Sequence, residues 1–318
     1  MADGTLSGVE RWRSAWERAL YGPGGFYVRE APRDHFRTSV VASPLFAAAV
    51  RRLAERVDVS LGRPDPFEVV DVGAGRGELL HALRDVSPRW RLTAVERAPD
   101  PGTGLAWRSD VPPVTGLLLA HELLDVVPLD VLDGDRLVLV DAAGREAPGP
   151  RADADALAWA RRWWPGGGRV EVGLARDRVW ADLVARVQRG VAVAVDYGHL
   201  RGTRRPTLTG YRAGRQVPPV PDGSCDLTAH VALDSCAAVT GARLLRQREV
   251  LRELGLHARL PTWTGDGLAY AAALQDASQA AQLLDVAALG GFGWLVRAVG
   301  VPDPLADVPA TLPESMGG

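Results

Sequence analysis

A short glycine-rich loop directly after an apolar stretch is the feature that most constrains the fold of this chain. The β-branched run Phe67 to Val72 predicts a buried strand, and Gly73, Gly75 and Gly77 follow it. Alternate glycines let the backbone turn sharply and approach a ligand closely. A helix is expected next, and its free amide groups would face the loop. The alternative is a strand-to-helix turn that binds nothing.

The spacing of the glycines indicates which ligand the loop suits. A dinucleotide fingerprint has its third glycine where this chain has Glu78, so the third glycine here comes one residue early. The form acidic-x-Gly-x-Gly-x-Gly is associated with S-adenosyl-L-methionine, whose cationic ammonium group suits Asp71. Glu96 ends the next strand candidate, about 20 residues after the loop, where a carboxylate can accept hydrogen bonds from ribose hydroxyl groups. We therefore expect the cofactor to be bound by Asp71, Gly73, Gly75, Gly77 and Glu96.

Composition sets outer limits on the function. With 318 residues, the chain is long enough for one domain with large insertions or for two unequal domains. A net charge of -2 gives no global attraction to nucleic acid or to a membrane, and no apolar run approaches the roughly 18 residues of a spanning helix. The charged helix predicted from Arg11 to Arg18 does not resemble a signal peptide, so we expect a cytoplasmic protein. Two cysteines and few histidines predict no metal site.

Strand and helix candidates alternate after the glycine loop, which predicts a parallel, Rossmann-like α/β sheet covered on both faces. Further strands are expected at 91–96, 116–120, 191–196, 242–250 and 292–299, with an inserted hairpin near 137–144 and a helix at 151–162. The predicted units are a helical N-terminal cap (1–62), a cofactor-binding core (63–200), a region with a substrate loop and the remaining strands (201–300), and a disordered tail (301–318).

Ligands in open α/β sheets bind beyond the carboxyl ends of the strands, so polar residues directly after strands are candidates for catalysis. His121, Glu122 and Asp125 follow the strand near 116–120, and a helical turn would place the two acids on one face. Paired carboxylates suit a guanidinium, whose fork they match. In the alternative interpretation, both acids only stabilise the beginning of a helix.

A second group of polar residues follows the strand at 191–196. Asp196, Tyr197 and His199 either line a substrate pocket or only terminate the strand at a turn. Asp226 is expected to cap a helix. The arginines of the loop 201–224 indicate a solvated surface or a site for an acidic partner, and they lack the interleaved aromatic residues of a nucleic-acid site.

Several segments together resemble the MidA-like family, which includes the mitochondrial complex I assembly factor 7 type of arginine methyltransferase. The matching segments are Gly25-Phe26-Tyr27-Val28, Phe36-Arg37-Thr38-Ser39, Asp71 to Gly77, Leu119 to Pro128, Val195 to His199, Gly210-Tyr211, Asp226 to Val231 and Leu251 to Leu256. The chain departs from the family pattern at Asp34-His35-Phe36 and after Ser39. These departures lie in the N-terminal cap, where substrate identity is least constrained.

The resemblance implies a seven-strand class I methyltransferase sheet with substrate-binding insertions and S-adenosyl-L-methionine as cofactor. It places Glu122, Asp125 and His121 at the reaction centre and makes an arginine of a protein partner a possible methyl acceptor. Two other functions remain open. One is a small-molecule methyltransferase in which His121 or His199 acts as general base, and the other is a cofactor-binding scaffold that transfers no methyl group.

Overall fold

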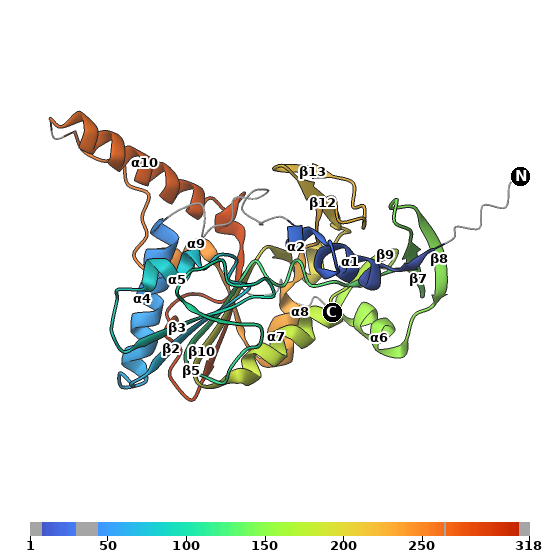
Figure 1. Cartoon of the computed structure of the whole chain (residues 1–318), viewed down its shortest axis with the longest axis horizontal. Coiled ribbons are helices and arrows are strands. Elements are labelled where there is room, and N and C mark those ends of the chain that lie inside the picture. Colours follow the sequence, from blue (N-terminus) through green and yellow to red (C-terminus); the bar gives the residue numbers. More distant parts are fainter. Residues whose placement is uncertain (1–7, 30–43, 264, 312–318) are drawn as a thin grey trace, which may run out of the picture.

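The computed structural model describes residues 8–29, 44–263 and 265–311, and a sheet of seven strands forms its centre (Figure 1). The strand order is β16-β17-β10-β5-β2-β3-β4. The five strands from β10 to β4 are parallel, whereas β17 is antiparallel to both of its neighbours. The bounds are β2 (Phe67–Val72), β3 (Trp90–Val95), β4 (Ala106–Arg108), β5 (Val114–His121), β10 (Val187–Asp196), β16 (Arg243–Arg246) and β17 (Gly293–Val299). The predicted seven-strand α/β sheet is confirmed, and β17 is the one antiparallel strand in this otherwise parallel sheet.

The direction of winding reverses at β2. The chain places β3 and β4 on one side of β2, and β5 and β10 on the other. The side chains of β2, β5 and the second half of β10 are mostly apolar and buried, as expected for parallel strands covered on both faces. The crevice beyond the carboxyl ends of β2 and β5 is therefore the place where this class of sheet binds its ligands.

Helices cover both faces of the central sheet. On one face, the buried side chains Phe46, Leu53 and Leu80 belong to a core that also includes α9 and the base of α10. On the other face, Trp180 and Cys236 pack against the sheet. The helix bounds are α4 (Pro44–Ser60), α5 (Glu78–Leu83) and α9 (Gln247–Glu253) on the first face, and α7 (Leu174–Arg186) and α8 (Leu233–Thr240) on the second.

Two insertions at the carboxyl ends of β5 and β10 build an accessory layer beside the sheet (Figure 1). The first forms a sheet in the order β1-β7-β6-β9, with β8 on β7, and the second forms the three strands β13-β12-β14 and the pair β11-β15. Helices α1 and α2 share an apolar core with both insertions. The bounds are β1 (Glu10–Arg11), α1 (Trp12–Tyr21), α2 (Phe26–Arg29), β6 (Asp130–Asp133), β7 (Arg136–Val140), β8 (Glu146–Arg151), α6 (Ala154–Trp163), β9 (Arg169–Val172), β11 (Gly198–His199), β12 (Thr209–Arg212), β13 (Arg215–Val217), β14 (Asp226–Thr228) and β15 (Val231–Ala232).

Helix α10 (Gly267–Leu284) extends away from the body of the molecule (Figure 1). Its buried residues are Ala280, Leu283 and Leu284, all in the last two turns. Asp266 caps the other end, because its carboxylate accepts hydrogen bonds from the amides of Leu268 (2.9 Å) and Ala269 (3.1 Å). None of the helices in the described part of the chain has the length and apolar character that crossing a membrane requires.

Several local predictions are confirmed and others are wrong. The hairpin and the helix expected in the first insertion are present as β7, β8 and α6. The strand predicted at 242–250 ends at Arg246, and α9 begins at the next residue. The surface loop predicted at 201–224 contains the hairpin of β12 and β13. Asp226 does not cap a helix, because pairing with β12 places it in strand β14.

The predicted disorder of the tail is wrong for residues 301–311. Leu305 and Val308 are buried in the core, and Arg243 forms an ion pair with Asp303 at 2.6 Å. Residues 312–318 lie outside the described residues, as do the N-terminal motif Phe36 to Ser39 and the departures beside it. The division into four units remains a prediction.

Candidate active site

The glycine loop, defined here as residues 71–77, leaves β2 at the point where the winding reverses. All three glycines have left-handed backbones, with φ of 77° at Gly73, 59° at Gly75 and 80° at Gly77. A Cβ atom at Gly77 would lie 2.6 Å from Leu105 Cδ1, and one at Gly73 would lie 3.0 Å from Leu123 Cδ1. Both the conformation and the lack of space therefore require glycine here.

Glu96 lies against this loop. It follows the last residue of β3, and its Oε2 accepts a hydrogen bond from the Gly75 amide at 3.1 Å, while its Oε1 accepts one from the Arg97 amide at 2.7 Å. The structure thus brings together the loop and the acid that the sequence analysis assigned to one ligand. The arrangement suits a ligand with vicinal hydroxyl groups.

Asp71 is buried within β2 and faces two other acids. Burial, together with the nearby carboxylates of Glu96 and Glu78, raises the pKa of its carboxyl group to about 7. Among the described residues, none donates a hydrogen bond to this carboxylate. A buried acid in this condition favours a cationic ligand group, because a positive charge offsets the desolvation cost of the ionised form.

The segment after β5 does not form the helical turn that the sequence predicted. Glu122 has a left-handed backbone with φ of 49°, and its amide donates to the carbonyl of Val195 at 2.8 Å. Bends and turns continue to residue 127, so Glu122 and Asp125 do not share a helix face. A left-handed conformation at a residue other than glycine costs about 1–3 kcal/mol, and such strain clusters at functional sites.

His121 is the last residue of β5 and is buried. Its ring packs edge-on against Phe46, with 5.0 Å between centroids, and burial lowers its pKa to about 3. Its Nε2 lies 3.5 Å from Glu122 Oε1. Because the imidazole is neutral, this contact is not an ion pair. His121 is therefore poorly suited to accept and keep a proton at neutral pH.

Asp196 holds the same segment from the neighbouring strand. Its Oδ2 accepts hydrogen bonds from the amides of Leu124 at 2.9 Å and Asp125 at 3.1 Å. Its Oδ1 is buried without a hydrogen-bond partner among the described residues. Burial raises the pKa of Asp196 well above its usual range, and the charges of Asp125 and Glu122 act in the same direction.

Asp125 is buried beside Asp196. Tyr197 and Thr228 both donate hydroxyl hydrogen bonds to its Oδ2, the latter at 2.7 Å. Within the described chain, its Oδ1 has no hydrogen-bond partner. Burial raises the pKa of Asp125, and the two hydroxyl donors oppose that shift. Asp125, Asp196, Tyr197 and Thr228 are called the carboxylate cluster below.

A third buried acid, Asp226, lies next to the carboxylate cluster. The hydroxyl of Tyr27 in α2 contacts both oxygens of Asp226 at 2.9 Å. Burial raises the pKa of Asp226 well above its usual range, with the charge of Asp125 adding to the effect. The motif Gly25 to Val28 thus joins the N-terminal helices to the second insertion.

Arg176 is a buried residue beneath the cluster that the sequence analysis missed. It is 1% exposed and donates to the main-chain carbonyls of Asp125, Val127 (3.1 Å), Ala229 (2.8 Å) and His230 (3.0 Å). None of these bonds goes to a carboxylate. Helical spacing gave the signal, because Arg176 lies four residues before the buried Trp180 and seven before Leu183.

His199 lies apart from the carboxylate cluster, on the short strand β11. Its ring packs edge-on against Trp164 at 5.3 Å, and burial, with the charge of Arg204 as the next cause, lowers its pKa to about 3. Arg204 itself is buried and forms an ion pair with Asp234. Of the residues predicted to line a pocket, the structure therefore brings Asp196 and Tyr197 to the cluster but not His199.

Comparisons with known proteins indicate the family of the chain. Residues 85–248 match the model of the family described as "Putative S-adenosyl-L-methionine-dependent methyltransferase". Two similar curated proteins are named protein arginine methyltransferase NDUFAF7, mitochondrial, or its homolog. The one from Drosophila melanogaster is 28% identical over 65% of this chain and 61% of its own length. The one from Xenopus tropicalis is 27% identical over 74% and 69%. The match therefore spans about three fifths of the fly relative.

Similar solved structures support the fold. A protein of Burkholderia thailandensis, described as a "likely methyl transferase" bound to S-adenosyl-homocysteine, is 23% identical, with a TM-score of 0.78 over 97% of this chain and 93% of that one. A second structure from the same organism has a TM-score of 0.75 at 24% identity, over 94% and 90%. The family model covers more than half of the 318 residues. The chain belongs to this family of S-adenosyl-L-methionine-dependent methyltransferases.

Proposed function

We propose that the protein transfers a methyl group from S-adenosyl-L-methionine to an arginine side chain of a protein partner. One observation carries the choice of acceptor. Asp125 and Asp196 are buried at the carboxyl ends of β5 and β10, and each keeps one oxygen without a hydrogen-bond partner among the described residues. A buried carboxylate oxygen without a hydrogen-bond donor is costly, even though the charge of Arg176 partly offsets both acids. A guanidinium would offset the remaining charge and supply donors in a fork. The names of the curated relatives agree with this acceptor.

The residues of the glycine loop fit the cofactor. Asp71 is a buried acid suited to its ammonium group, Glu96 is suited to its ribose hydroxyls, and the left-handed glycines let the backbone approach it. When bound, the cofactor supplies an electrophilic methyl group on a sulfonium. The fit rests on the chemistry and placement of these side chains.

The carboxylate cluster would orient the acceptor and localise its charge. Methyl transfer is an in-line displacement, so alignment and exclusion of water contribute more than a covalent nucleophile. Asp196 fixes the main chain of Leu124 and Asp125, while Tyr197 and Thr228 orient the Asp125 carboxylate. A carboxylate whose pKa burial has raised also suits the proton that the guanidinium loses on methylation.

A small-molecule methyltransferase with a histidine base is the less supported alternative. A general base acts best when its pKa lies near the working pH. Burial lowers the pKa of both His121 and His199 to about 3, which weakens them as bases at neutral pH. A pH-rate profile with an apparent pKa between 6 and 7 would favour this alternative again.

The experiment is methyl transfer from tritiated S-adenosyl-L-methionine to proteins of a cell lysate, followed by hydrolysis and detection of methylarginine. Asp125→Asn keeps the shape of the side chain and removes its charge, so we expect transfer to fall roughly 100-fold or more while calorimetric cofactor affinity is kept. Asp182→Asn, an exposed substitution on α7, is the control.

Three other results would contradict the proposal. Detection of the methyl label on residues other than arginine would show that the acceptor is not arginine. Normal transfer by Asp125→Asn would remove the carboxylate cluster from the mechanism. Saturable cofactor binding with no transfer in any lysate would favour the scaffold.

A further inference from the structure

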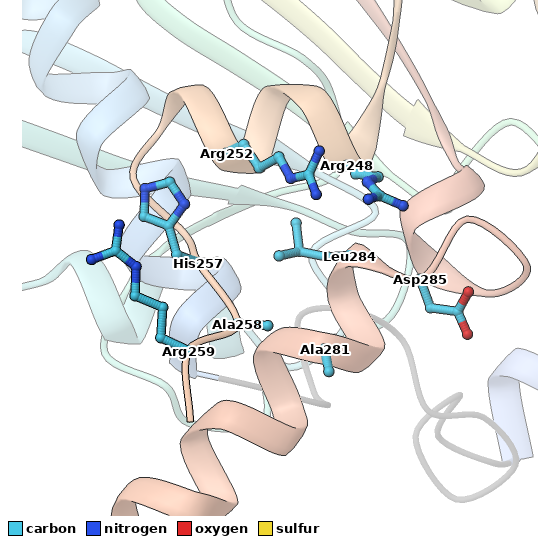
Figure 2. A pocket seen from close by; sticks show the side chains of 8 residues that line it. All are labelled: Arg248, Arg252, His257, Ala258, Arg259, Ala281, Leu284 and Asp285. Atoms are coloured by element: carbon cyan, nitrogen blue, oxygen red, sulfur yellow. The ribbon is translucent and has the colours of Figure 1, made fainter. Parts of the chain in front are cut away.

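A hollow of about 440 Å³ lies between α9, the segment after it and α10, and no residue of the glycine loop lines it (Figure 2). Its basic side chains are Arg248, Arg252, His257 and Arg259. Figure 2 shows the arginines of α9 along one side, with Ala281 and Leu284 of α10 across from them. We call this cavity, with its four basic side chains, the basic hollow.

The positive charge of the basic hollow is only weakly offset within the described residues. Arg248 and Arg252 lie 3.8 Å and 3.7 Å from one oxygen of Glu249, which is beyond hydrogen-bond distance. No ion pair involves Arg259 in the described part of the chain. Asp285 lines the opposite end, and its carboxylate points away from His257 and Arg259 (Figure 2). An anionic ligand group in the hollow would therefore contact three guanidinium groups that form no close ion pair with the described residues.

An apolar arm continues from the basic hollow. The arm consists of residues 260–263 and helix α10, which would be about 27 Å long at 1.5 Å per residue. Of the eight exposed large apolar side chains in the described chain, Leu260, Trp263, Leu268 and Leu274 lie on this arm. Leu268 is 86% exposed, and Asp276 is the single charged residue of α10. An apolar surface of this kind marks a site of protein contact.

The basic hollow is joined to the catalytic edge of the sheet through a few residues. Gln247 is the first residue of α9 and precedes Arg248, and its main-chain amide donates a hydrogen bond to the carbonyl of Phe292 at 2.8 Å. The ring of Phe292 lies 5.5 Å from that of Tyr197 in the carboxylate cluster. Phe292 therefore links the first residue of α9, next to the basic hollow, with the carboxylate cluster.

We propose that the basic hollow and the apolar arm form a docking surface for an acidic segment of the protein substrate that also carries apolar side chains. The inference rests on the proposed transfer to a protein arginine. Charge complementarity identifies the occupant, because the hollow is cationic while the carboxylate cluster is anionic. An acceptor arginine would bind the anionic carboxylate cluster. Acidic residues near it would bind the basic hollow, and apolar residues would contact the arm.

The test uses the full chain and two labelled peptides that share one acceptor arginine. The first carries a tail that repeats Glu-Glu-Leu, and the second carries Gln-Gln-Leu. Fluorescence anisotropy measures binding at two salt concentrations, and calorimetry with S-adenosyl-L-methionine checks each protein separately. We expect the acidic peptide to bind at least about tenfold more tightly than the glutamine peptide, and the difference to shrink as salt rises.

Matched charge reversals locate the surface. The triple variant Arg248→Glu, Arg252→Glu and Arg259→Glu should remove the preference for the acidic peptide. The control is Arg136→Glu, Arg161→Glu and Arg186→Glu, which makes the same change of charge on exposed side chains of β7, α6 and α7. Loss of affinity in the control as well would reduce the effect to net charge and overturn the proposal. In the arm, Trp263→Ser with Leu268→Ser should weaken both peptides.

Kinetics separate this inference from the function on which it rests. For an active enzyme, the charge reversal should raise KM for the acidic peptide about tenfold and leave kcat unchanged, because docking precedes transfer. Charge-dependent binding without any transfer would sink the proposed function and keep the surface. Equal binding of both peptides would overturn the surface whatever the activity. Competition by inorganic phosphate at low millimolar concentration would overturn it too, since the hollow would then be a small-anion site.

Discussion

The two halves of the candidate active site are built in different ways. The glycine loop and Glu96 come from 26 consecutive residues, and main-chain geometry dominates their contacts. The carboxylate cluster combines residues from β10, β14 and the turn after β5, and depends on Arg176 in α7. A ligand common to many enzymes is thus met by a local motif, and the acceptor by contacts between distant segments. Substitutions should therefore damage the first half through binding and the second through folding and transfer.

Arg176→Met should give the largest effect on stability. The guanidinium supplies donors to four carbonyls of the segments around Asp125 and Ala229, and their loss leaves buried acceptors unsatisfied. We expect the free energy of unfolding, measured in urea, to fall by about 3–5 kcal/mol. The control Arg178→Met removes an exposed side chain from the same helix and should change it by less than about 1 kcal/mol. Equal losses would show that Arg176 does not organise the cluster.

The sequence predicts the local half of the site better than the half that is built from distant segments. The roles expected for Asp71, Gly75 and Glu96 depend on strand, loop and next strand, and the structure brings these three together as expected. Asp125 and Asp196 were candidates only because they follow strands. Tyr197 was one for the same reason, but the contact between its hydroxyl and Asp125 joins positions 72 residues apart.

The errors have the same physical origin. Glu122 was expected on a helix, but its amide is bound by Val195 of the adjacent strand, which fixes a left-handed turn instead. Asp226 has the local pattern of a helix cap, but pairing with Tyr211 in β12 holds it in a strand. Arg176 shares the buried face of its helix with Trp180, but only the carbonyls of distant segments show what a buried arginine does there. In each case, a distant partner overrides local propensity.

Gly77→Val tests the local half of the comparison. A valine there meets both the left-handed φ of 80° and the side chain of Leu105, so the loop cannot keep its path. We expect calorimetric affinity for S-adenosyl-L-methionine to fall roughly 100-fold, with a stability loss of about 1–3 kcal/mol. Gly134→Val has the same strain at φ of 60° but open space around it. If the control lost cofactor affinity to the same extent, general destabilisation would explain both results.

Asp71→Asn should change cofactor affinity less than Gly77→Val does. At pH 8 it should raise the stability of the protein and weaken cofactor binding. The pKa of Asp71 rises from 3.8 to about 7 in the folded protein, so the charged form is disfavoured there. Stability is therefore complete below about pH 4 and falls as pH rises toward 7, by an amount on the order of 2–4 kcal/mol. The asparagine variant should lack this slope and be more stable than the wild type at pH 8.

Cofactor binding should follow the opposite course, because an ammonium group favours the ionised carboxylate. Wild-type affinity should rise with pH up to about 7, and Asp71→Asn should bind roughly tenfold more weakly at pH 8 with a flatter profile. Chemical unfolding and calorimetry at pH 5, 6, 7 and 8 measure both trends, with the exposed Asp182→Asn as control. A variant that is stabilised and still binds normally would show that Asp71 is a buried acid without a cofactor role, and the local half of the site would then depend on Glu96 and the loop alone.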